Sequence, residues 1–235
     1  MKRRLLAFDI ETAKLLPEQV PDLLSHRPLG ITCAAVADIE GHREMLWHGR
    51  ESGTVAAQMS RAEAQELVRD LYRFVEEGYT LLTWNGLGFD FNILAEESGL
   101  QVECERLALA HVDMMFHVVC SKGFPLALDK VAQGMGLPGK PSGMSGSQAP
   151  ALWASGLQSE VLDYVVGDCR TTVAVAHAAE ERGGIEWVTA KGGRATMSLP
   201  SGWLTADQAM KLPLPDTSWM RTPLTRESFT DWIDR

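Results

Sequence analysis

An apolar run near the start of the chain meets two acidic residues, and this pattern constrains the fold most. Residues 5–10 are apolar except for Asp9, and Glu11 follows directly. A segment that is apolar on both faces is typical of a strand in the middle of a sheet. Side chains two apart in a strand point to the same side, so Asp9 and Glu11 should share one face near the strand's carboxyl end. Ligands commonly bind at this edge of α/β sheets.

The size and composition of the chain fit a single α/β domain with additions. Of the 235 residues, 45% are hydrophobic, which is enough for a sizeable core. The net charge of −9 argues against a basic sheath for duplex DNA. The four cysteines are scattered and lack a C-x-x-C pair, which favours free thiols in a reducing compartment. No apolar stretch reaches the ~20 residues needed to cross a bilayer, so we expect a cytoplasmic protein without a membrane partner.

Turn residues and apolar periodicity divide the rest of the chain into strands and helices. Helices are expected between Ser60 and Gly78, over residues 89–98 and over residues 160–182. Strands are expected at residues 31–39, 44–48, 79–84 and 107–111. Strands that come first and then alternate with helices give a mixed α/β sheet.

Two later segments lack clear periodicity. Residues 122–150 are rich in Gly, Pro and Ser, which predicts a mobile loop between helices. Residues 185–199 alternate weakly and are consistent with a hairpin. The tail over 200–235 contains four prolines but also three tryptophans and a phenylalanine, so we expect it to pack against the domain.

A third acidic residue follows the strand expected at 79–84. Asp90 comes after Asn85 and Gly86, at the start of the next helix. Taken alone, this position is explained by helix capping, because an acid near a helix start interacts favourably with the macrodipole.

Tyr164 and Asp168 lie four residues apart in the helix expected at 160–182, so they share one face of it. Gly167 stands between them. A glycine inside a strong helix costs about 1 kcal/mol and usually marks a close approach by another group.

Together these residues form three short motifs in a defined order along the chain. The sequence contains D-x-E, N-G-x-x-F-D and Y-x-x-x-D in that order, with the functional positions at Asp9, Glu11, Asp90, Tyr164 and Asp168. They resemble the three exonuclease motifs of the DEDD superfamily, the DnaQ-like exonucleases. Tyr164 matches the DEDDy type, similar to the exonuclease domain of family B DNA polymerases, whereas the DEDDh type would have a histidine where Asp163 stands.

The resemblance covers about residues 3–182 and implies an RNase H-like mixed sheet flanked by helices, with antiparallel N-terminal strands followed by parallel strands. We therefore expect an exonuclease domain over 1–184. Residues 185–235 would add a hairpin and a packed tail that extend the same domain.

The implied activity is 3′→5′ exonuclease hydrolysis of phosphodiester bonds, with release of nucleoside 5′-monophosphates. The expected substrates are single-stranded DNA or the 3′ ends of duplex DNA. The cofactors would be two divalent cations, Mg²⁺ or Mn²⁺, which carboxylate ligands favour. The implied metal ligands are Asp9, Glu11, Asp90 and Asp168.

The resemblance also implies separate roles for these residues. Asp9, Glu11 and Asp168 would hold the first metal, while Asp90 would hold a second that Asp9 bridges. Two such ions stabilise the attacking and the leaving oxygen of an in-line displacement. Tyr164 would orient the attacking water, because a phenol with a pKa near 10 is a poor base at pH 7.

Three further residues occupy motif positions that touch the terminal nucleotides in the family: Thr12, Asn85 and Phe89. Phe89 could stack on a base of any sequence. The alternative for Phe89 is a core aromatic residue beside a helix start.

Other functions fit parts of the same pattern. A 3′→5′ exoribonuclease of the RNase D type also uses the tyrosine, and the choice between sugars depends on contacts to the 2′-hydroxyl. An inactive nuclease fold kept as a nucleic-acid-binding module is a second alternative, although all four acids and Tyr164 are present. A small-molecule phosphodiesterase is a third, but the chain has no P-loop.

Overall fold

A mixed sheet forms the centre of the structure, a computed structural model that describes residues 3–17, 20, 22–139 and 145–233. This five-stranded sheet has the order β3-β2-β1-β6-β7. Its strands are β1 (Arg4–Thr12), β2 (Ile31–Ala37), β3 (Glu44–His48), β6 (Tyr79–Thr83) and β7 (Val112–Asp113). β1, β2 and β3 pair antiparallel, while β1, β6 and β7 pair parallel. The predicted mixed α/β sheet is confirmed.

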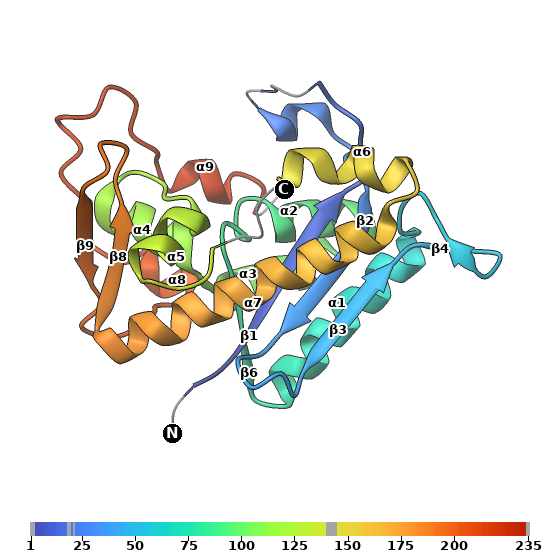
Figure 1. The fold of residues 1–235 in the computed structure, drawn as a ribbon, viewed down its shortest axis with the longest axis horizontal. Coiled ribbons are helices and arrows are strands. Elements are labelled where there is room, and N and C mark those ends of the chain that lie inside the picture. The colour runs from blue at the N-terminus through green and yellow to red at the C-terminus, as the bar shows by residue number, and fades with distance from the viewer. Residues whose placement is uncertain (1–2, 18–19, 21, 140–144, 234–235) are drawn as a thin grey trace.

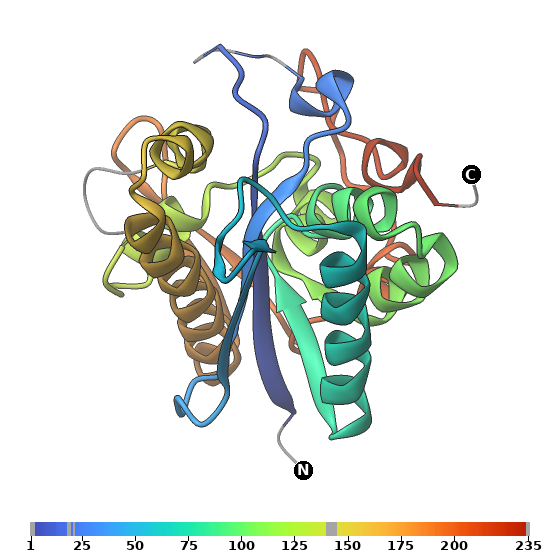
Figure 2. The same cartoon turned by 90° about the vertical axis from the view of Figure 1, so that its right-hand side faces the viewer.

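Helices cover both faces of the sheet. α7 (Gln158–Arg182) lies on one face and α1 (Arg61–Glu76) on the other, with the sheet between them (Figures 1 and 2). The remaining helices are α2 (Asp90–Ser98), α3 (Gln101–Ala110), α4 (Met114–Lys122), α5 (Leu128–Gly134), α6 (Ala149–Ala154), α8 (Ala206–Ala209) and α9 (Glu227–Thr230). Short 3-10 turns occur at Leu23–His26 and Gly146–Gln148, and a small separate ribbon is formed by β4 (Arg50–Glu51) and β5 (Thr54–Val55).

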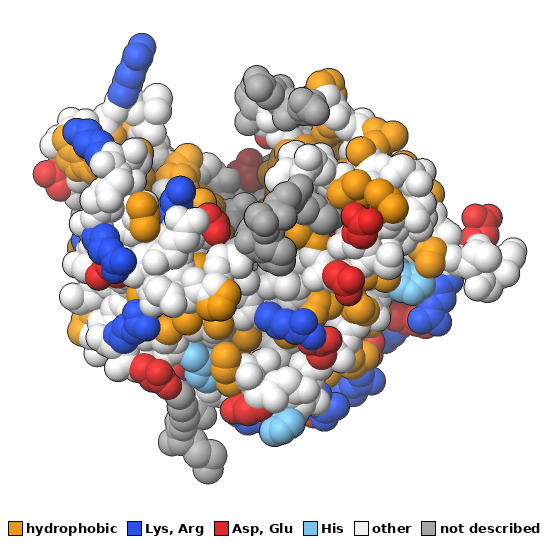
Figure 3. Space-filling view, viewed as in Figure 1, with side chains coloured by type: hydrophobic (Ala, Val, Ile, Leu, Met, Phe, Trp, Pro, Cys, Tyr) orange, Lys and Arg blue, Asp and Glu red, His pale blue; other side chains and the backbone are white. Residues whose placement is uncertain are grey.

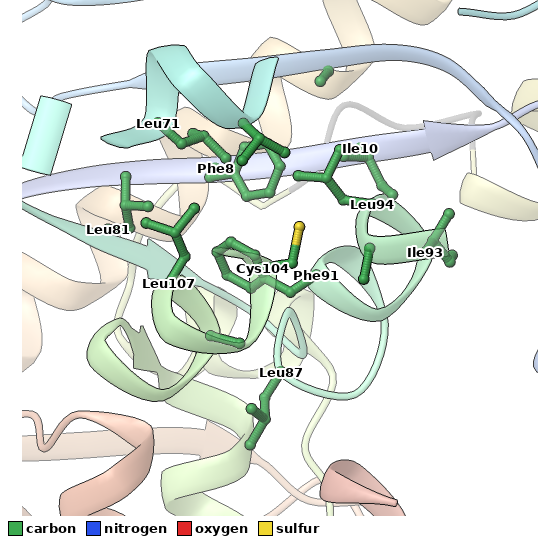
Figure 4. Packing of buried hydrophobic residues seen from close by; sticks show 14 of the residues in the cluster. Phe8, Ile10, Leu71, Leu81, Leu87, Phe91, Ile93, Leu94, Cys104 and Leu107 are labelled. Carbon is green, nitrogen blue, oxygen red and sulfur yellow. The ribbon is translucent and has the colours of Figure 1, made fainter. Parts of the chain in front are cut away.

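Alternate residues of β1 belong to two different cores. Leu6, Phe8 and Ile10 pack with residues of α1, α2 and α3, as Figure 4 shows for Phe8 and Ile10. Leu5 and Ala7 point the other way, into the core that contains α7. Because strand side chains alternate, the residues after Ala7 at the same parity also face α7. This parity places the side chains of positions 9 and 11 beside that helix.

The predicted start of α1 is confirmed by its cap. The backbone N–H of Glu63 donates to Ser60 Oγ at 3.3 Å, and the backbone N–H of Ser60 donates to the Glu63 carboxylate at 2.7 Å. Each bond satisfies a backbone donor that the first helical turn leaves without an intrahelical partner. These reciprocal bonds fix the helix start at the predicted residue.

The strand predicted at residues 107–111 is wrong. α3 continues to Ala110, and β7 begins only at Val112. The buried side chains Cys104, Leu107 and Ala108 follow helical spacing, and a short apolar run does not by itself distinguish a strand from a buried helix.

The loop predicted over residues 122–150 is wrong in part, because it contains α5 and the start of α6. Leu128, Val131 and Ala132 of α5 are buried at helical spacing, and Pro150 stands in the first turn of α6, where proline is tolerated. Residues 140–144 of the predicted loop lie outside the described residues.

The C-terminal part contributes side chains to both cores. β8 (Gly184–Val188) and β9 (Arg194–Ser198) pair antiparallel. In the following tail, Trp203, Phe229 and Trp232 are buried, whereas Trp219 is 69% exposed. In the part of the chain that the structure describes, every helix is too short or too polar to traverse a lipid bilayer.

Candidate active site

Three carboxylates meet where the end of β1 faces α7. Asp9 and Glu11 project from β1 on the α7 side, and Asp168 projects from α7 toward them. Each of the three offers a carboxylate oxygen, and these oxygens lie within 4.8 Å of one another. Glu11 and Asp168 are each only 6% exposed. The structure thus brings together residues from the first strand and from a late helix.

Asp90 joins this group from the first turn of α2. Its Oδ1 accepts the backbone N–H of Ile10 at 3.0 Å, and its side chain is hydrogen-bonded to Asp9. Burial raises the pKa of Asp90 to about 7, against the lowering effect of the Ile10 N–H. Two carboxyl groups in such contact need a proton or a cation between them. Asp90 is only 2% exposed, so its carboxyl group lies deeper in the protein than that of the half-buried Asp9.

The turn between β6 and α2 is bound to Asp113 at the end of β7. Asp113 accepts the backbone N–H groups of Asn85 at 3.0 Å and Leu87 at 2.9 Å. It also caps α4 by accepting the N–H of Phe116 at 2.9 Å. Asn85 has φ of 80°, a region that residues with a side chain rarely adopt. Burial raises the pKa of Asp113 to about 6 although these N–H groups oppose that rise.

A cavity of about 350 Å³ opens in front of the carboxylates. Figure 3 shows that the molecule is notched between the part that carries β8 and β9 and the part that carries α6. The polar and aromatic residues that line the cavity are Asp9, Glu11, Thr12, Lys14, Phe89, Ser147, Tyr164 and Asp168. Among the described residues, neither Asn85 nor Asp90 belongs to this lining.

Tyr164 stands one helical turn before Asp168, and both line the cavity. The Tyr164 side chain is 5% exposed, so its ring is packed while the residue still borders the cavity. Glu160 and Asp163 of the same helix are exposed.

A sequence model described as the RNase H superfamily matches residues 6–179 of the chain. The chain belongs to the RNase H superfamily. Its membership supports a nuclease activity in general terms. No curated protein sequence matches the chain.

A solved structure supports the same fold. The chain is similar to the family B DNA polymerase from the hyperthermophilic archaeon Pyrobaculum calidifontis, with a TM-score of 0.55 and 22% sequence identity. The likeness covers 75% of this chain, which spans only 24% of the length of that polymerase. At this identity the likeness shows the fold alone.

The oxygen donors of this RNase H superfamily chain fit a hard divalent cation. Carboxylates favour Mg²⁺ or Mn²⁺ over softer metals. Carboxylates as close as those of Asp9, Glu11 and Asp168 repel one another unless a cation lies between them.

A second group with metal-ligand atoms within 4.8 Å consists of Asp38, Glu40 and His42. It follows β2, at the opposite edge of the sheet from the cavity. Glu40 and His42 are exposed there, and the Asp38 carboxylate already accepts the backbone N–H of His42 at 2.9 Å. We assign no function to this group.

Sequence reasoning missed two parts of the cavity wall. Lys14 borders the cavity and its Nζ donates to the carbonyl of His26 at 2.6 Å. The sequence signal that could have identified Lys14 was its position shortly after Thr12, a residue expected to contact the substrate. Ser147 comes from the segment predicted as a loop, and only the folded chain reveals that this segment meets β1.

The interpretation of Gly167 as a point of close approach is wrong within the described residues. A Cβ atom added there would meet no atom within 4 Å. Gly134 does mark a close approach, because a Cβ atom added there would lie 2.3 Å from the carbonyl oxygen of Glu186. Gly134 therefore permits α5 to approach β8.

Proposed function

We propose that the chain is a metal-dependent 3′→5′ exonuclease of the DEDDy type. The observation that carries the proposal is the convergence of Asp9, Glu11 and Asp168 beside Tyr164 on one cavity. The superfamily match supports a nuclease, and the order of the three motifs supports the exonuclease branch. Convergent buried acids have no evident use in a purely binding module, which makes the inactive alternative less favourable.

Asp9, Glu11 and Asp168 would hold one divalent cation, and Asp90 with Asp9 would hold a second. Bound cations of this kind lower the pKa of water and stabilise the leaving 3′-oxygen. The protein's own contribution is to fix the carboxylates on two rigid elements, β1 and α7. Preorganised ligands of this kind lose little freedom when the reaction occurs.

Tyr164 and the cavity wall would orient the substrate and the water. The phenol of Tyr164 is suited to hydrogen-bond the attacking water near the Asp168 carboxylate. Phe89 offers a ring on which the terminal base can stack, and Thr12 a hydroxyl. Lys14 supplies a positive charge that suits a phosphate on the same wall. The substrate we favour is single-stranded, because its bases are free to stack, and the resemblance to polymerase exonuclease domains favours DNA.

A nuclease assay tests this assignment directly. 5′-labelled single-stranded DNA, single-stranded RNA and a recessed duplex are incubated with Mg²⁺ or Mn²⁺. We expect a ladder that shortens from the 3′ end and disappears in EDTA. Asp168→Ala should reduce the rate at least 10²-fold, since the first cation loses a ligand.

Asp163→Ala is the matched control, because Asp163 is an exposed acid on the same helix. It should retain the wild-type rate. Activity in EDTA, or equal rates in the Asp168 variant and wild type, would contradict the proposal. Faster hydrolysis of RNA than of DNA would favour the exoribonuclease alternative.

A further inference from the structure

The C-terminal tail reaches back to the turn that precedes Asp90. Trp232 is 1% exposed, and its indole Nε1 donates to the carbonyl of Leu87 at 2.7 Å. The side chain of Gln101 on α3 donates to the carbonyl of Trp232 at 2.8 Å, which fixes the end of the tail in turn. This tail lies beyond residue 179, where the match to the superfamily ends.

Leu87 is therefore held through both of its backbone polar groups. Its N–H donates to Asp113 at 2.9 Å and its carbonyl accepts from Trp232. Its side chain is fully buried and lies at the edge of the core around Phe91 (Figure 4). The turn also contains Asn85 at φ of 80°, a conformation that costs about 1–3 kcal/mol and persists only when neighbours hold it. Asp113 supplies that restraint at the N–H groups of Asn85 and Leu87, and Trp232 supplies it at the carbonyl of Leu87.

A second tail residue packs against the next position of the turn. A Cβ added at Gly88 would lie 3.0 Å from the ring of Phe229, so the tail touches the backbone there. Phe229 is 5% exposed and packs on Phe116, with ring centroids 5.3 Å apart. The residue after Gly88 is Phe89, which lines the cavity.

We propose that Trp232 and Phe229 are positioning residues for the substrate-binding turn over residues 85–89. They act through Leu87 and Gly88 to fix Phe89 for stacking on the 3′-terminal base. This inference rests on the proposed exonuclease function and deepens it.

Loss of the tail contacts should weaken substrate binding more than the chemical step. Asp90 keeps its bond from the Ile10 N–H, and among the described residues the cavity that Asp9, Glu11 and Asp168 line has no lining residue from the tail. Phe89 follows Leu87 and Gly88 directly, and its N–H donates to the carbonyl of Asn85 within the same turn, so its position depends on that turn staying closed. KM for a short single-stranded oligonucleotide should therefore rise while kcat stays within twofold.

The test compares two buried indoles of the same tail. Trp232→Phe keeps a ring but removes the donor to Leu87, and we expect KM to rise about fivefold. Trp203→Phe is the matched control, since Trp203 is fully buried and donates to the carbonyl of Ala176 on α7 at 3.3 Å. Both variants should lower the melting temperature, but only the first should raise KM.

Equal KM values in the two variants and in wild type would overturn the inference. Phe229→Leu provides a second variant if Trp232→Phe does not fold, and it should raise KM in the same direction. A KM increase in Trp203→Phe as large as in Trp232→Phe would show a general structural effect and would also overturn it.

Hydrogen exchange separates this inference from the proposed function. The backbone N–H groups of Phe89 and Phe91 donate to the carbonyls of Asn85 and Gly86, so they report the closed turn. We expect faster exchange of these two amides in Trp232→Phe and not in Trp203→Phe. If wild type hydrolyses no nucleic acid but this difference appears, the exonuclease proposal fails while the positioning of the turn stands. If the difference is absent, the positioning itself is refuted.

Discussion

Asp90 shows at the scale of one residue how burial decides the state of a carboxyl group. It is fully enclosed, yet it contacts the carboxylate of Asp9 and the N–H of Ile10. Burial favours the neutral form, while the hydrogen bonds favour the charged form. A divalent cation would shift this balance toward the charged form by replacing the shared proton.

Asp90→Asn tests this balance. Because burial raises the pKa of Asp90 from 3.8 to about 7, ionisation disfavours the folded state. Stability from the protonated form is fully present below about pH 4 and is lost as the pH rises to 7. In EDTA at pH 8, the uncharged asparagine should therefore increase the free energy of unfolding by about 1–3 kcal/mol. Urea denaturation at pH 4 and pH 8 measures the difference.

Added Mn²⁺ should stabilise wild type more than the Asp90 variant, because the variant keeps only the ligands of the first cation. Asp163→Asn, at an exposed position on α7, should resemble wild type in every condition. A wild type that is more stable than Asp90→Asn in EDTA at pH 8 would contradict the argument.

At the scale of secondary-structure elements, two helical glycines have opposite surroundings. Gly134 lies against the backbone of Glu186 and Trp187, which a Cβ would approach to 2.3 Å and 2.4 Å. Gly167 is a glycine inside α7 with space around it. Glycine costs helix stability wherever close packing does not require it.

Alanine substitutions at Gly134 and Gly167 should change the stability of the protein in opposite directions. Gly134→Ala should destabilise by about 1–3 kcal/mol, because α5 must move away from β8. Gly167→Ala should stabilise by up to about 1 kcal/mol through helix propensity. Thermal melts of both variants measure the effect, and a destabilising Gly167→Ala would show that the helix does need glycine there.

Elements set by local signals were predictable, and elements set by distant partners were not. Glu63 three residues after Ser60 and the alternation along β1 are local patterns, and both appear in the structure. α5 depends on packing with β8, far along the chain, so the Gly, Pro and Ser content of residues 122–150 suggested a loop instead. The acids of the candidate site could be named from order and spacing. The bond from Trp232 to Leu87 joins residues with no shared motif, so only the folded chain reveals it.

Across the whole molecule, two buried histidines connect layers of the fold. The His111 ring contacts Thr83 Oγ1 at 2.9 Å, and His117 Nδ1 accepts the backbone N–H of Leu204 in the tail at 3.4 Å. Burial lowers the pKa of each to about 4. Both are therefore neutral in the folded protein at pH 5, whereas the unfolded chain binds protons near pH 6.5.

This difference predicts acid sensitivity. Stability from neutral His117 is fully present above about pH 6.5 and is lost as the pH falls to 4. His117→Phe keeps a ring against Trp203 but cannot titrate. Between pH 7 and pH 5, wild type should lose on the order of 2 kcal/mol relative to this variant. Urea titrations at both pH values measure the relative change, and parallel pH profiles would refute it.

The carboxylate cluster draws on residues that are far apart in the chain. Asp9 belongs to the first strand and Asp168 to a helix formed much later in the chain. A cation shared by them would act as a reversible cross-link between segments about 160 residues apart, and it would stabilise the fold because it binds the folded chain and not the unfolded one. Under this view, a chelator loosens the attachment of β1 to α7 as well as stopping catalysis. The same ion would then stabilise the folded state as well as take part in hydrolysis.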